Sequence, residues 1–272
     1  MTKTYVITGA TSGIGMELVK ILAKDNIVFA GYRDEKKIEK YSEISTSILP
    51  FYVDYSKPET IIEAVRYIKS KCEKIDTLIN VAGCVVAGPC ERISVDEIRR
   101  QFNVNTFGHL ELSQGLLEYL EGGRIINVSS MASYGIFPFV APYCASKRAL
   151  DMLFNSILME TKKDIKIISV KPGVIATPLW DKSVDENLKH QERKAGFEKE
   201  MEYLINNARD NGKYGANVQT VVKTILKADR TKFPKLSYTV GLDAFVAHYF
   251  SLLPQCIINK IVRLGVSKKI LN

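Results

Sequence analysis

Tyr143 and Lys147 are spaced one helical turn apart, and Ser130 precedes the tyrosine by thirteen residues. Residues four apart lie on the same face of a helix, so this spacing would place an ammonium beside the Tyr143 phenol. A free tyrosine has a pKa of about 10, and lowering it to roughly 7 requires about 4 kcal/mol of preferential stabilisation of the phenolate. A nearby cation is a source of that stabilisation. The three residues therefore predict a tyrosine that exchanges a proton near neutral pH.

The spacing alone is not specific, because Tyr32 and Lys36 repeat it, as do Tyr67 and Lys71. An ordinary helix face with a solvated lysine would carry the same pair. The interpretation of Tyr143 therefore depends on the elements and motifs in the rest of the chain.

Strand-like and helix-like segments alternate along the chain. The apolar runs that indicate strands cover residues 4–8, 27–31, 48–53, 77–80, 124–129 and 165–170, with 236–240 as a seventh candidate. Apolar stripes of helical period lie between them, including a long one over 95–120 and another over 145–159. This alternation predicts a single Rossmann-type, doubly wound parallel sheet of about seven strands, with helices on both faces. Such sheets bind ligands at the carboxyl ends of their strands.

Composition excludes several other classes of protein. The net charge of +8 is modest for 272 residues, and no nucleic-acid motif or dense basic block is present, so we expect no nucleic-acid binding. The five cysteines and three histidines form no CxxC pair and no metal-ligand spacing, which predicts free thiols, a reducing compartment and no metal site. We see neither a signal peptide nor an apolar run long enough to span a membrane. These features predict a cytoplasmic protein.

A glycine-rich turn follows the first predicted strand and opens the first predicted helix, which is where a dinucleotide turn belongs. Gly9 has access to backbone angles that are closed to other residues, Gly13 lets the backbone approach a diphosphate, and Gly15 lets helix and strand pack closely. The helix N-terminus then presents free N–H groups to a phosphate. We expect the cofactor contacts of this turn to come from residues Gly9, Thr11, Ser12, Gly13, Ile14 and Gly15.

The end of the second strand indicates which dinucleotide is bound. NAD-binding folds usually place an acid there for the ribose 2′-hydroxyl. This chain has Tyr32 at that position, followed by Arg33. A guanidinium suits a 2′-phosphate, so NADP(H) is favoured over NAD(H). The alternative is that Arg33 is a surface residue that pairs with Asp34.

The motifs together resemble those of the classical short-chain dehydrogenase/reductases over nearly the whole chain. The glycine turn is similar to the family's TGxxxGIG motif, and Asp54 matches the acid that contacts the adenine ring. Residues 80–83 resemble the NNAG motif, with Val81 in place of the second asparagine, and a Pro-Gly pair followed by a threonine resembles the segment beside the nicotinamide. The resemblance thus adds these cofactor contacts: Asp54, Asn80, Ala82, Gly83, Tyr143, Lys147, Pro172, Gly173 and Thr177.

The resemblance also implies a catalytic tetrad of Asn105, Ser130, Tyr143 and Lys147. It implies a reversible carbonyl–alcohol interconversion by hydride transfer at the nicotinamide, with Tyr143 as general acid or base. Lys147 would lower the phenol pKa and bond the nicotinamide ribose, and Ser130 would hold the substrate oxygen. Ser129 and Ser133 are neighbours, so the choice of Ser130 rests on register. A helix-interior amide bonded locally is the alternative for Asn105.

The later part of the chain indicates where a substrate would bind and what kind of substrate it would be. We expect residues 1–241 to form the dehydrogenase domain, with a helical lid at about 178–212 over a pocket walled by residues 84–90, 134–140 and 178–205. Apolar residues there, including Phe137, Phe139 and Trp180, favour a lipophilic ketone or alcohol, and the chain looks most like the hydroxysteroid and retinol dehydrogenase branch. Alternatives are a ketoacyl-type or other small-carbonyl reductase, or a non-catalytic NADP(H)-sensing protein.

Residues 242–272 form an amphipathic, helical extension whose basic residues come late, at Lys260, Arg263, Lys268 and Lys269. We expect it to pack on the same domain or against a partner subunit, with a peripheral membrane contact as the alternative. The family resemblance implies a homodimer or homotetramer.

Overall fold

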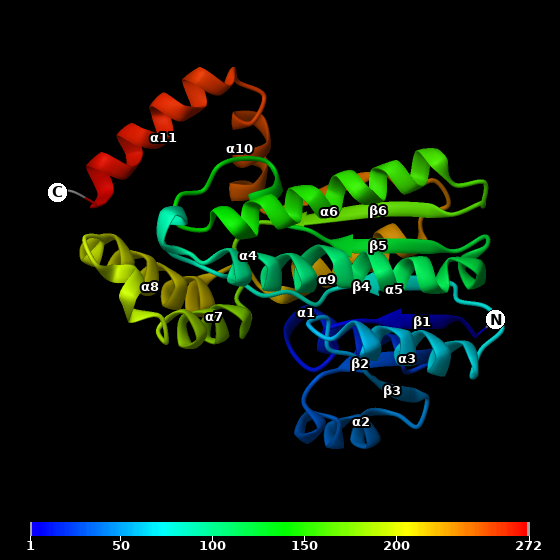
Figure 1. Ribbon diagram of the computed structural model, residues 1–272. Coiled ribbons are helices and arrows are strands. Elements are labelled where there is room, and N and C mark those ends of the chain that lie inside the picture. The colour runs from blue at the N-terminus through cyan, green and yellow to red at the C-terminus, as the bar shows by residue number, and fades with distance from the viewer. Residues whose placement is uncertain (1, 271–272) are drawn as a thin grey trace.

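The computed structural model describes residues 2–270, and within them the side chains of all residues except 191 and 266–270. Over this part of the chain, seven strands form one sheet (Figure 1): β1 (Thr4–Ile7), β2 (Ile27–Tyr32), β3 (Ile48–Tyr52), β4 (Thr77–Asn80), β5 (Arg124–Val128), β6 (Lys166–Pro172) and β7 (Ser237–Val240). Their order is β3-β2-β1-β4-β5-β6-β7, and all neighbours are parallel. The doubly wound fold predicted from the alternation is confirmed.

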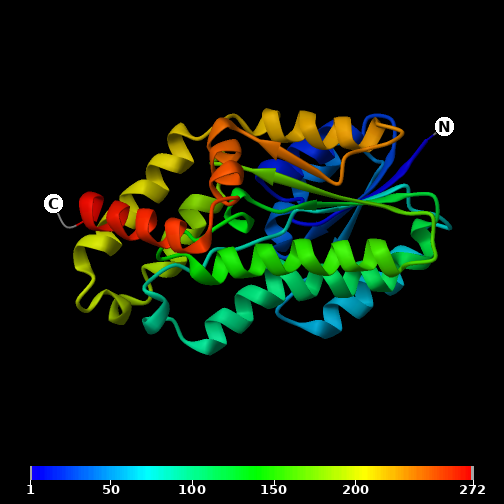
Figure 2. The same ribbon diagram turned by 90° about the horizontal axis from the view of Figure 1, so that it is seen from above.

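The central strands are apolar because both faces of the sheet are covered. Helices α1 (Gly13–Leu22) and α9 (Val218–Arg230) pack on one face, where Leu18 and Ile225 are fully buried. Helices α3 (Pro58–Lys69), α5 (Gly108–Leu116) and α6 (Ala141–Glu160) pack on the other face, around Leu112 and Phe154. Figure 2, seen from above, shows the sheet between α9 and α6. Short α2 (Glu39–Ile44) and the 3-10 turn η1 (Glu35–Lys37) follow β2.

The long helical pattern over 95–120 is interrupted in the structure. It consists of α4 (Val95–Phe102), a π-helical segment η3 (Asn103–Phe107), α5 and a 3-10 turn η4 (Leu117–Leu120). Ser94 and Glu97 form a reciprocal capping box at the start of α4. A π turn contains one residue more than an α turn of the same rise, and apolar periodicity does not reveal it.

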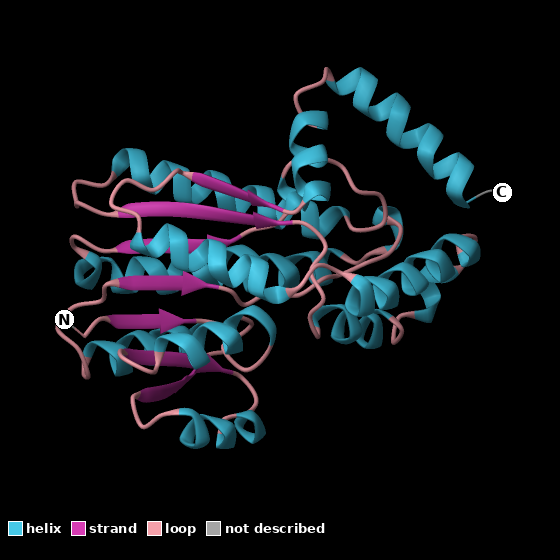
Figure 3. Cartoon of the chain, turned by 180° about the vertical axis from the view of Figure 1, so that it is seen from behind, coloured by secondary structure: helices cyan, strands magenta, loops and turns pink. Residues whose placement is uncertain are grey.

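All seven strands end at the same side of the molecule, and the remaining helices lie beyond those ends (Figure 3). They are α7 (Leu179–Asn187), η6 (Gln191–Lys194), α8 (Glu198–Tyr214), α10 (Leu242–Phe250) and α11 (Gln255–Ile270), together with short turns η2 (Cys90–Arg92) and η5 (Met131–Ser133). β1 and β4 are neighbours, so strand order reverses between them. A ligand site is therefore expected beyond the ends of these two strands.

Helix α10 packs against η5 and β7, and α11 reaches α8. Much of the apolar surface of these helices and of the turn between them is exposed: Leu242 is 81% exposed, Tyr249 67% and Leu252, in the turn, 68%. The side chains of Lys268 and Lys269 lie outside the described part. Of the helices that the structure describes, none has the length and apolar character needed to cross a bilayer.

Candidate active site

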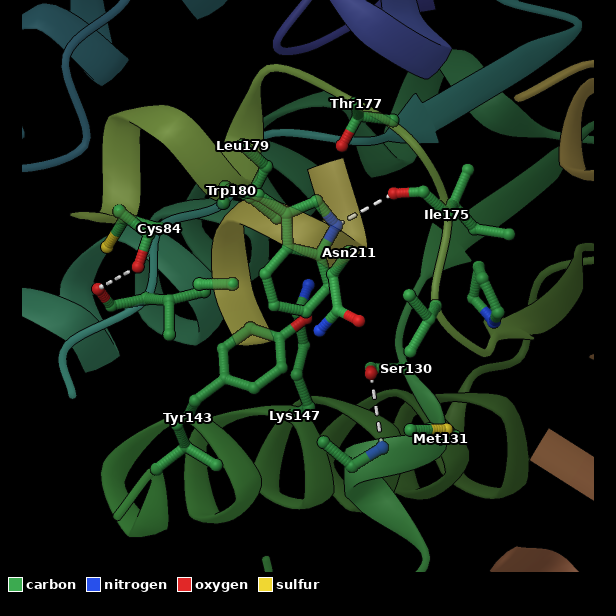
Figure 4. A pocket seen from close by; sticks show the side chains of 18 of the residues that line it. Cys84, Ser130, Met131, Tyr143, Lys147, Ile175, Thr177, Leu179, Trp180 and Asn211 are labelled. Atoms are coloured by element: carbon green, nitrogen blue, oxygen red, sulfur yellow. Dashed lines mark hydrogen bonds between the residues drawn. The ribbon is translucent and has the colours of Figure 1, made fainter. Parts of the chain in front are cut away.

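Tyr143 and Lys147 both project from the first turns of α6 into one cavity (Figure 4). Pro142 lies in the first turn of the helix, where its missing N–H leaves no bond unmade. Lys147 is only 3% exposed, and its Nζ donates to the carbonyl oxygen of Val128 at 2.9 Å. The lysine is therefore anchored to the end of β5, and the tyrosine is held one turn away from it.

The electrostatics of this pair differ from the expectation of a phenol that titrates near neutral pH. Burial raises the pKa of Tyr143 to about 12, and the hydroxyl of Ser130 opposes that shift. Burial likewise lowers the pKa of Lys147 to about 8, against the raising effects of Asp151 and Cys84. In this structure burial is the largest influence on both pKa values, because the charged forms of both side chains lose water.

Ser130 follows β5 and begins the turn η5. Its Oγ accepts from the backbone N–H of Ala132 at 3.1 Å, which fixes the hydroxyl at the mouth of the turn. Figure 4 shows this hydroxyl facing the cavity that also holds the phenol of Tyr143. Ser129 lines the cavity too, whereas Ser133 does not. Of the three serines that were candidates for the catalytic hydroxyl, Ser133 therefore does not reach the cavity.

Asn105 lies in the π segment and is fully buried. Its Oδ1 accepts from the Cys84 N–H at 2.9 Å, and its Nδ2 donates to the Cys84 carbonyl and to the Ser146 hydroxyl, both at 3.0 Å. A Cβ added at Gly83 would lie 3.5 Å from Asn105 Oδ1 and 3.8 Å from Lys147 Nζ. The asparagine thus lies behind the cavity wall, next to the lysine, and joins α6 to the segment after β4.

The glycine turn forms a close cradle between β1 and α1. Gly9 and Gly13 adopt positive φ angles of 61° and 53°. A Cβ at Gly9 would lie 2.8 Å from Ala82 Cα, and one at Gly13 would lie 3.4 Å from Thr177 Cβ. Thr8 Oγ1 accepts from the N–H groups of Val81, at 2.9 Å, and Ala82, at 3.2 Å. The turn lines the cavity at the start of α1, where free backbone N–H groups can bind a phosphate, so it fits a dinucleotide.

One end of the cavity is formed by the residues after β2 and β3. Arg33 and Asp54 both line it, and Arg33 is exposed. Asp34 pairs with Lys37 at 3.2 Å, so the described ion pairs do not include the Arg33–Asp34 pair that was the alternative. Asp54 accepts from the N–H and the hydroxyl of Ser56. Arg33 thus lines the same cavity as the glycine turn.

Most of the predicted site residues meet in this cavity, and three do not. Gly15 is buried against Gly9, where a Cβ would clash with the Gly9 carbonyl oxygen. Asn80 is buried inside the sheet, and its Nδ2 donates to Asn127 at 2.8 Å and to Ser113 at 3.3 Å. Asn105 is the third. The cavity-lining residues among those predicted are Gly9, Thr11, Ser12, Gly13, Ile14, Arg33, Asp54, Ala82, Gly83, Ser130, Tyr143, Lys147, Pro172, Gly173 and Thr177. Gly15, Asn80 and Asn105 support these residues from behind.

The cavity has a volume of about 1820 Å³ and continues past Tyr143 under α7 and α8. Trp180 is held by a bond from its Nε1 to the Ile175 carbonyl oxygen at 2.8 Å. Phe139 has a positive φ of 65°, a strained conformation for an aromatic residue. The sequence did not predict one wall of the cavity, which is formed by residues of α10 and α11. They are Leu242, Val246, Ala247, Phe250, Val262 and Gly265.

The α7–α8 segment is tied to the sheet side through buried polar contacts. Arg193, which is 1% exposed, forms an ion pair with Glu97 and donates to the carbonyl oxygen of Ala87 at 3.1 Å. Asn187 accepts from the Ala87 N–H at 2.8 Å. The segment 188–197 after α7 is thereby fixed to α4 and to the chain after β4. No local pattern in the sequence signals this long-range pair.

Among the residues that the structure describes, no group of three histidine, cysteine or acidic side chains is placed to bind a metal ion. The chain matches the family model of the short chain dehydrogenases over residues 3–188. This match covers more than half of its length, and the chain belongs to that family. Its fold and its cavity at the strand ends thus define an oxidoreductase of the short-chain dehydrogenase type, whose relatives interconvert carbonyls and alcohols.

Two curated relatives illustrate the similarity. The "NADPH-dependent 3-dehydrocapnine reductase" of Ornithobacterium rhinotracheale is 28% identical over 250 residues, which cover 87% of each chain. The "NADPH-dependent 1-acyldihydroxyacetone phosphate reductase" of Saccharomyces cerevisiae is 31% identical over 190 residues, or 66% of this chain and 63% of the yeast protein.

Solved structures share the fold at low identity. A short chain dehydrogenase from Burkholderia cenocepacia in complex with NADP has a TM-score of 0.74, with 22% identity, and the alignment covers 96% of this chain and 97% of the other. A short chain dehydrogenase/reductase from Burkholderia phymatum in complex with NAD also has a TM-score of 0.74, with 17% identity and coverage of 87% and 88%. Proteins of this fold therefore include complexes with either dinucleotide.

Proposed function

We propose that this protein is an NADP(H)-dependent oxidoreductase that interconverts a lipophilic ketone or aldehyde and the corresponding alcohol. The observation that carries this proposal is that Tyr143, Ser130 and the glycine turn all face one cavity. A proton donor, a hydroxyl that orients the substrate oxygen and a dinucleotide cradle are the parts such a reaction requires.

The bound dinucleotide would supply the hydride in reduction. Tyr143 would then donate its phenolic proton to the carbonyl oxygen as the C–H bond forms, and take a proton back from solvent afterwards. The raised pKa of Tyr143 keeps the phenol protonated at physiological pH, which suits a general acid. Ser130 would donate to the same oxygen and hold it in place. In the oxidative direction, each proton moves the opposite way.

Lys147 would act on this proton transfer through its charge, and Asn105 would act by holding the helix that carries the tyrosine. The Lys147 ammonium, bound to the Val128 carbonyl, places a positive charge one helical turn from the tyrosine, and it would also bond the ribose beside the nicotinamide. Asn105 is a positioning residue, because its amide holds Ser146 of α6 and the backbone of Cys84. The lysine and tyrosine are consequently fixed relative to the end of β4.

The preference for NADP(H) rests on Arg33. Its guanidinium lines the cavity just after β2, where Tyr32 replaces the acid that a 2′-hydroxyl would require. Arginine binds phosphate through forked hydrogen bonds as well as charge. Both relatives described above carry the words "NADPH-dependent" in their names, which supports the same preference.

The proposed substrate is lipophilic because the far wall of the cavity is aromatic and aliphatic. Trp180, Phe139 and Phe250 contribute to that wall. We propose a steroid- or retinoid-like carbonyl compound, as in the hydroxysteroid and retinol dehydrogenase branch. The name of the yeast relative adds an acyl-chain ketone to the substrates worth testing. The segment 178–212 would form the lid over this substrate.

The decisive experiment measures NADPH consumption by the purified full chain with a panel of carbonyl compounds. The panel contains steroid ketones, retinal, ketoacyl esters, an acyl-dihydroxyacetone phosphate and sugars. We expect turnover with at least one apolar carbonyl and none with sugars. NADPH binding without turnover of any carbonyl would contradict the enzymatic proposal and favour a dinucleotide-sensing role. Turnover of ketoacyl esters alone would favour the small-carbonyl alternative.

We also propose that α10 and α11 contact an anionic membrane surface. No acidic residue follows Asp243, whereas the segment contains Lys260, Arg263, Lys268 and Lys269. Its exposed apolar side chains adjoin those that line the cavity: Val246 is 62% exposed and is also part of the cavity wall. A surface that is both apolar and basic binds anionic bilayers, and here it would lie next to the route for an apolar substrate.

Flotation with vesicles that contain phosphatidylserine tests this contact in the full chain. We expect the wild type to float and a Leu252→Asp, Ile261→Asp double variant to remain in solution. Ile62→Asp, on exposed α3 surface, is the control and should float like the wild type. A wild type that fails to float but forms a dimer that the double variant abolishes would overturn the membrane proposal in favour of a second copy of this chain.

A further inference from the structure

Lys182 reaches from α7 to the glycine turn. Its Nζ donates to the hydroxyl of Ser12 at 3.1 Å, although the two residues are 170 positions apart in the chain. Ser12 is the N-cap residue just before α1, yet its side chain accepts no N–H of that helix. Both residues line the cavity. A cation from the later half of the chain is therefore held against the start of α1, where a dinucleotide phosphate would lie.

The surroundings of Lys182 are positively charged. Lys182 is exposed to solvent on one side, and its partial burial lowers its pKa. The nearby charges of Lys37 and Arg33 lower this pKa further, while Asp34 opposes them. Asp34 is the ion-pair partner of Lys37 in the described structure. The structure gives neither Arg33 nor Lys182 an ion-pair partner among its described salt bridges, so a phosphate anion would relieve the repulsion between these two cations.

The opposite side of α7 is fastened to the chain after β4. Ser183 donates to the Val85 carbonyl at 3.2 Å, and Asn187 Nδ2 donates to the same oxygen at 2.9 Å. The helix consequently bridges the cavity, with its polar contacts to Val85 on one side and the Lys182–Ser12 bond on the other. The backbone position of Lys182 is thus set by an anchored helix, and its exposed side chain reaches Ser12 from there.

We propose that Lys182 is a phosphate-binding residue for the dinucleotide and that its bond to phosphate holds α7 closed over the cofactor. This inference rests on the proposed function, because it presumes that a dinucleotide occupies the glycine turn. The ammonium would exchange the Ser12 hydroxyl for a phosphate oxygen, or bind both, and form a charge-assisted hydrogen bond. Arg33 and Lys182, which both line the cavity, would then both contact the cofactor.

Calorimetric titration of the full chain with NADPH and with NADH tests the proposal. We expect Lys182→Gln to weaken binding by about tenfold, the effect of one lost charge-assisted bond, and Lys182→Arg to keep most of the affinity. The control is Lys189→Gln, which removes a cation that pairs with Glu186 on the exposed side of the same segment. It should bind both dinucleotides like the wild type.

Comparing the affinities for NADPH and NADH identifies which phosphate of the cofactor Lys182 contacts. Equal losses for NADPH and NADH in Lys182→Gln would assign the lysine to the diphosphate, and a loss confined to NADPH would assign it to the 2′-phosphate. Unchanged affinities for both would overturn the inference while leaving the proposed function intact. A wild type that binds neither dinucleotide would instead overturn the proposed function, and this inference with it.

Hydrogen exchange provides a readout that is independent of affinity. Binding of saturating NADPH should slow amide exchange in α7 of the wild type, because ligand and helix stabilise each other reciprocally. At saturation, Lys182→Gln should lose this protection in α7 while the start of α1 stays protected. Equal protection of α7 in both proteins would show that the lysine does not couple the helix to the cofactor.

Discussion

The ammonium of Lys147 donates to the carbonyl oxygen of Val128, 2.9 Å away, and so joins the start of α6 to the end of β5. Ser130 lies two residues beyond Val128, and Tyr143 lies one helical turn before Lys147. This hydrogen bond therefore links the helix of the proposed proton donor to the strand that precedes the proposed substrate-binding hydroxyl.

Removing the phenolic hydroxyl tests the role of the proton donor. Tyr143→Phe should lower the rate of carbonyl reduction by about a hundredfold or more, because general acid catalysis contributes at least that much. Its affinity for NADPH should stay within about twofold of the wild type. Tyr134→Phe is a matched control, since the Tyr134 hydroxyl bonds Thr239 at 2.6 Å and lies outside the cavity lining. Steady-state kinetics and calorimetry would measure both, and near wild-type turnover in Tyr143→Phe would exclude the tyrosine.

The pH dependence of reduction should follow Lys147. Its pKa of about 8 means that the ammonium loses its charge as the pH rises through that value, whereas Tyr143, with a pKa of about 12, keeps its proton. We expect kcat/KM for reduction to be level below about pH 8 and to fall by about tenfold per pH unit above it. Lys147→Arg stays charged and should lack this fall, even if its rate is lower throughout. A wild-type profile that remains level to about pH 10 would contradict the role of the lysine charge.

Reversing the charge after β2 should change the cofactor preference. In Arg33→Asp, the carboxylate would repel a 2′-phosphate and accept a bond from a 2′-hydroxyl, so the ratio of NADPH to NADH affinity should fall by at least about tenfold. Lys40→Asp makes the same charge change on the exposed surface of α2 and serves as the control. Titrations with both dinucleotides measure the ratio. An unchanged ratio in Arg33→Asp would move the 2′-phosphate contact to another residue.

Acid should destabilise the protein through His109. This fully buried ring donates from Nε2 to the Ala82 carbonyl at 2.8 Å, and burial, with Lys147 nearby, lowers its pKa to about 3. The unfolded chain binds the proton below about pH 6.5, so the folded state loses stability from that pH downward, by at most about 1.4 kcal/mol per pH unit.

His109→Gln keeps a donor for Ala82 but cannot titrate. Urea unfolding at several pH values between about 7 and 5 should therefore show a shallower loss of stability in the variant than in the wild type. Parallel losses in the two proteins would assign the acid sensitivity to other groups.

The elements of the fold follow from local patterns, and much of the candidate site does too. Strand runs, the glycine turn and the Tyr143–Lys147 spacing are visible because they depend on residues close in sequence. The bond between Lys182 and Ser12 is not visible, because it joins residues brought together only by the fold. The same reason hides the cavity wall contributed by α10 and α11.

Desolvation is a second limit on sequence reasoning. The spacing of Tyr143 and Lys147 predicts a phenol with a lowered pKa. In the structure both groups are buried, which raises the pKa of Tyr143 and lowers that of Lys147, so the neutral form of each is favoured. Likewise Gly15 and Asn80 belong to motifs associated with the cofactor, yet they are packed behind the residues that line the cavity. A motif identifies the segment, whereas packing decides which of its atoms reach a ligand.

Because residues 103–107 form the π segment η3, the number of residues in this stretch determines how α4, Asn105 and α5 are aligned. Each residue of an α-helix advances the chain by about 100° around the axis. Excising one residue from 103–107 would let an ordinary helix run from α4 into α5 in nearly the present orientation, because the π turn holds one residue more than an α turn. That change would still move the amide of Asn105 out of alignment with Ser146. Inserting a further residue would instead rotate α5 by roughly that angle and turn its apolar stripe off the sheet. This stretch should consequently accept exchanges of side chain far more readily than any change in residue count.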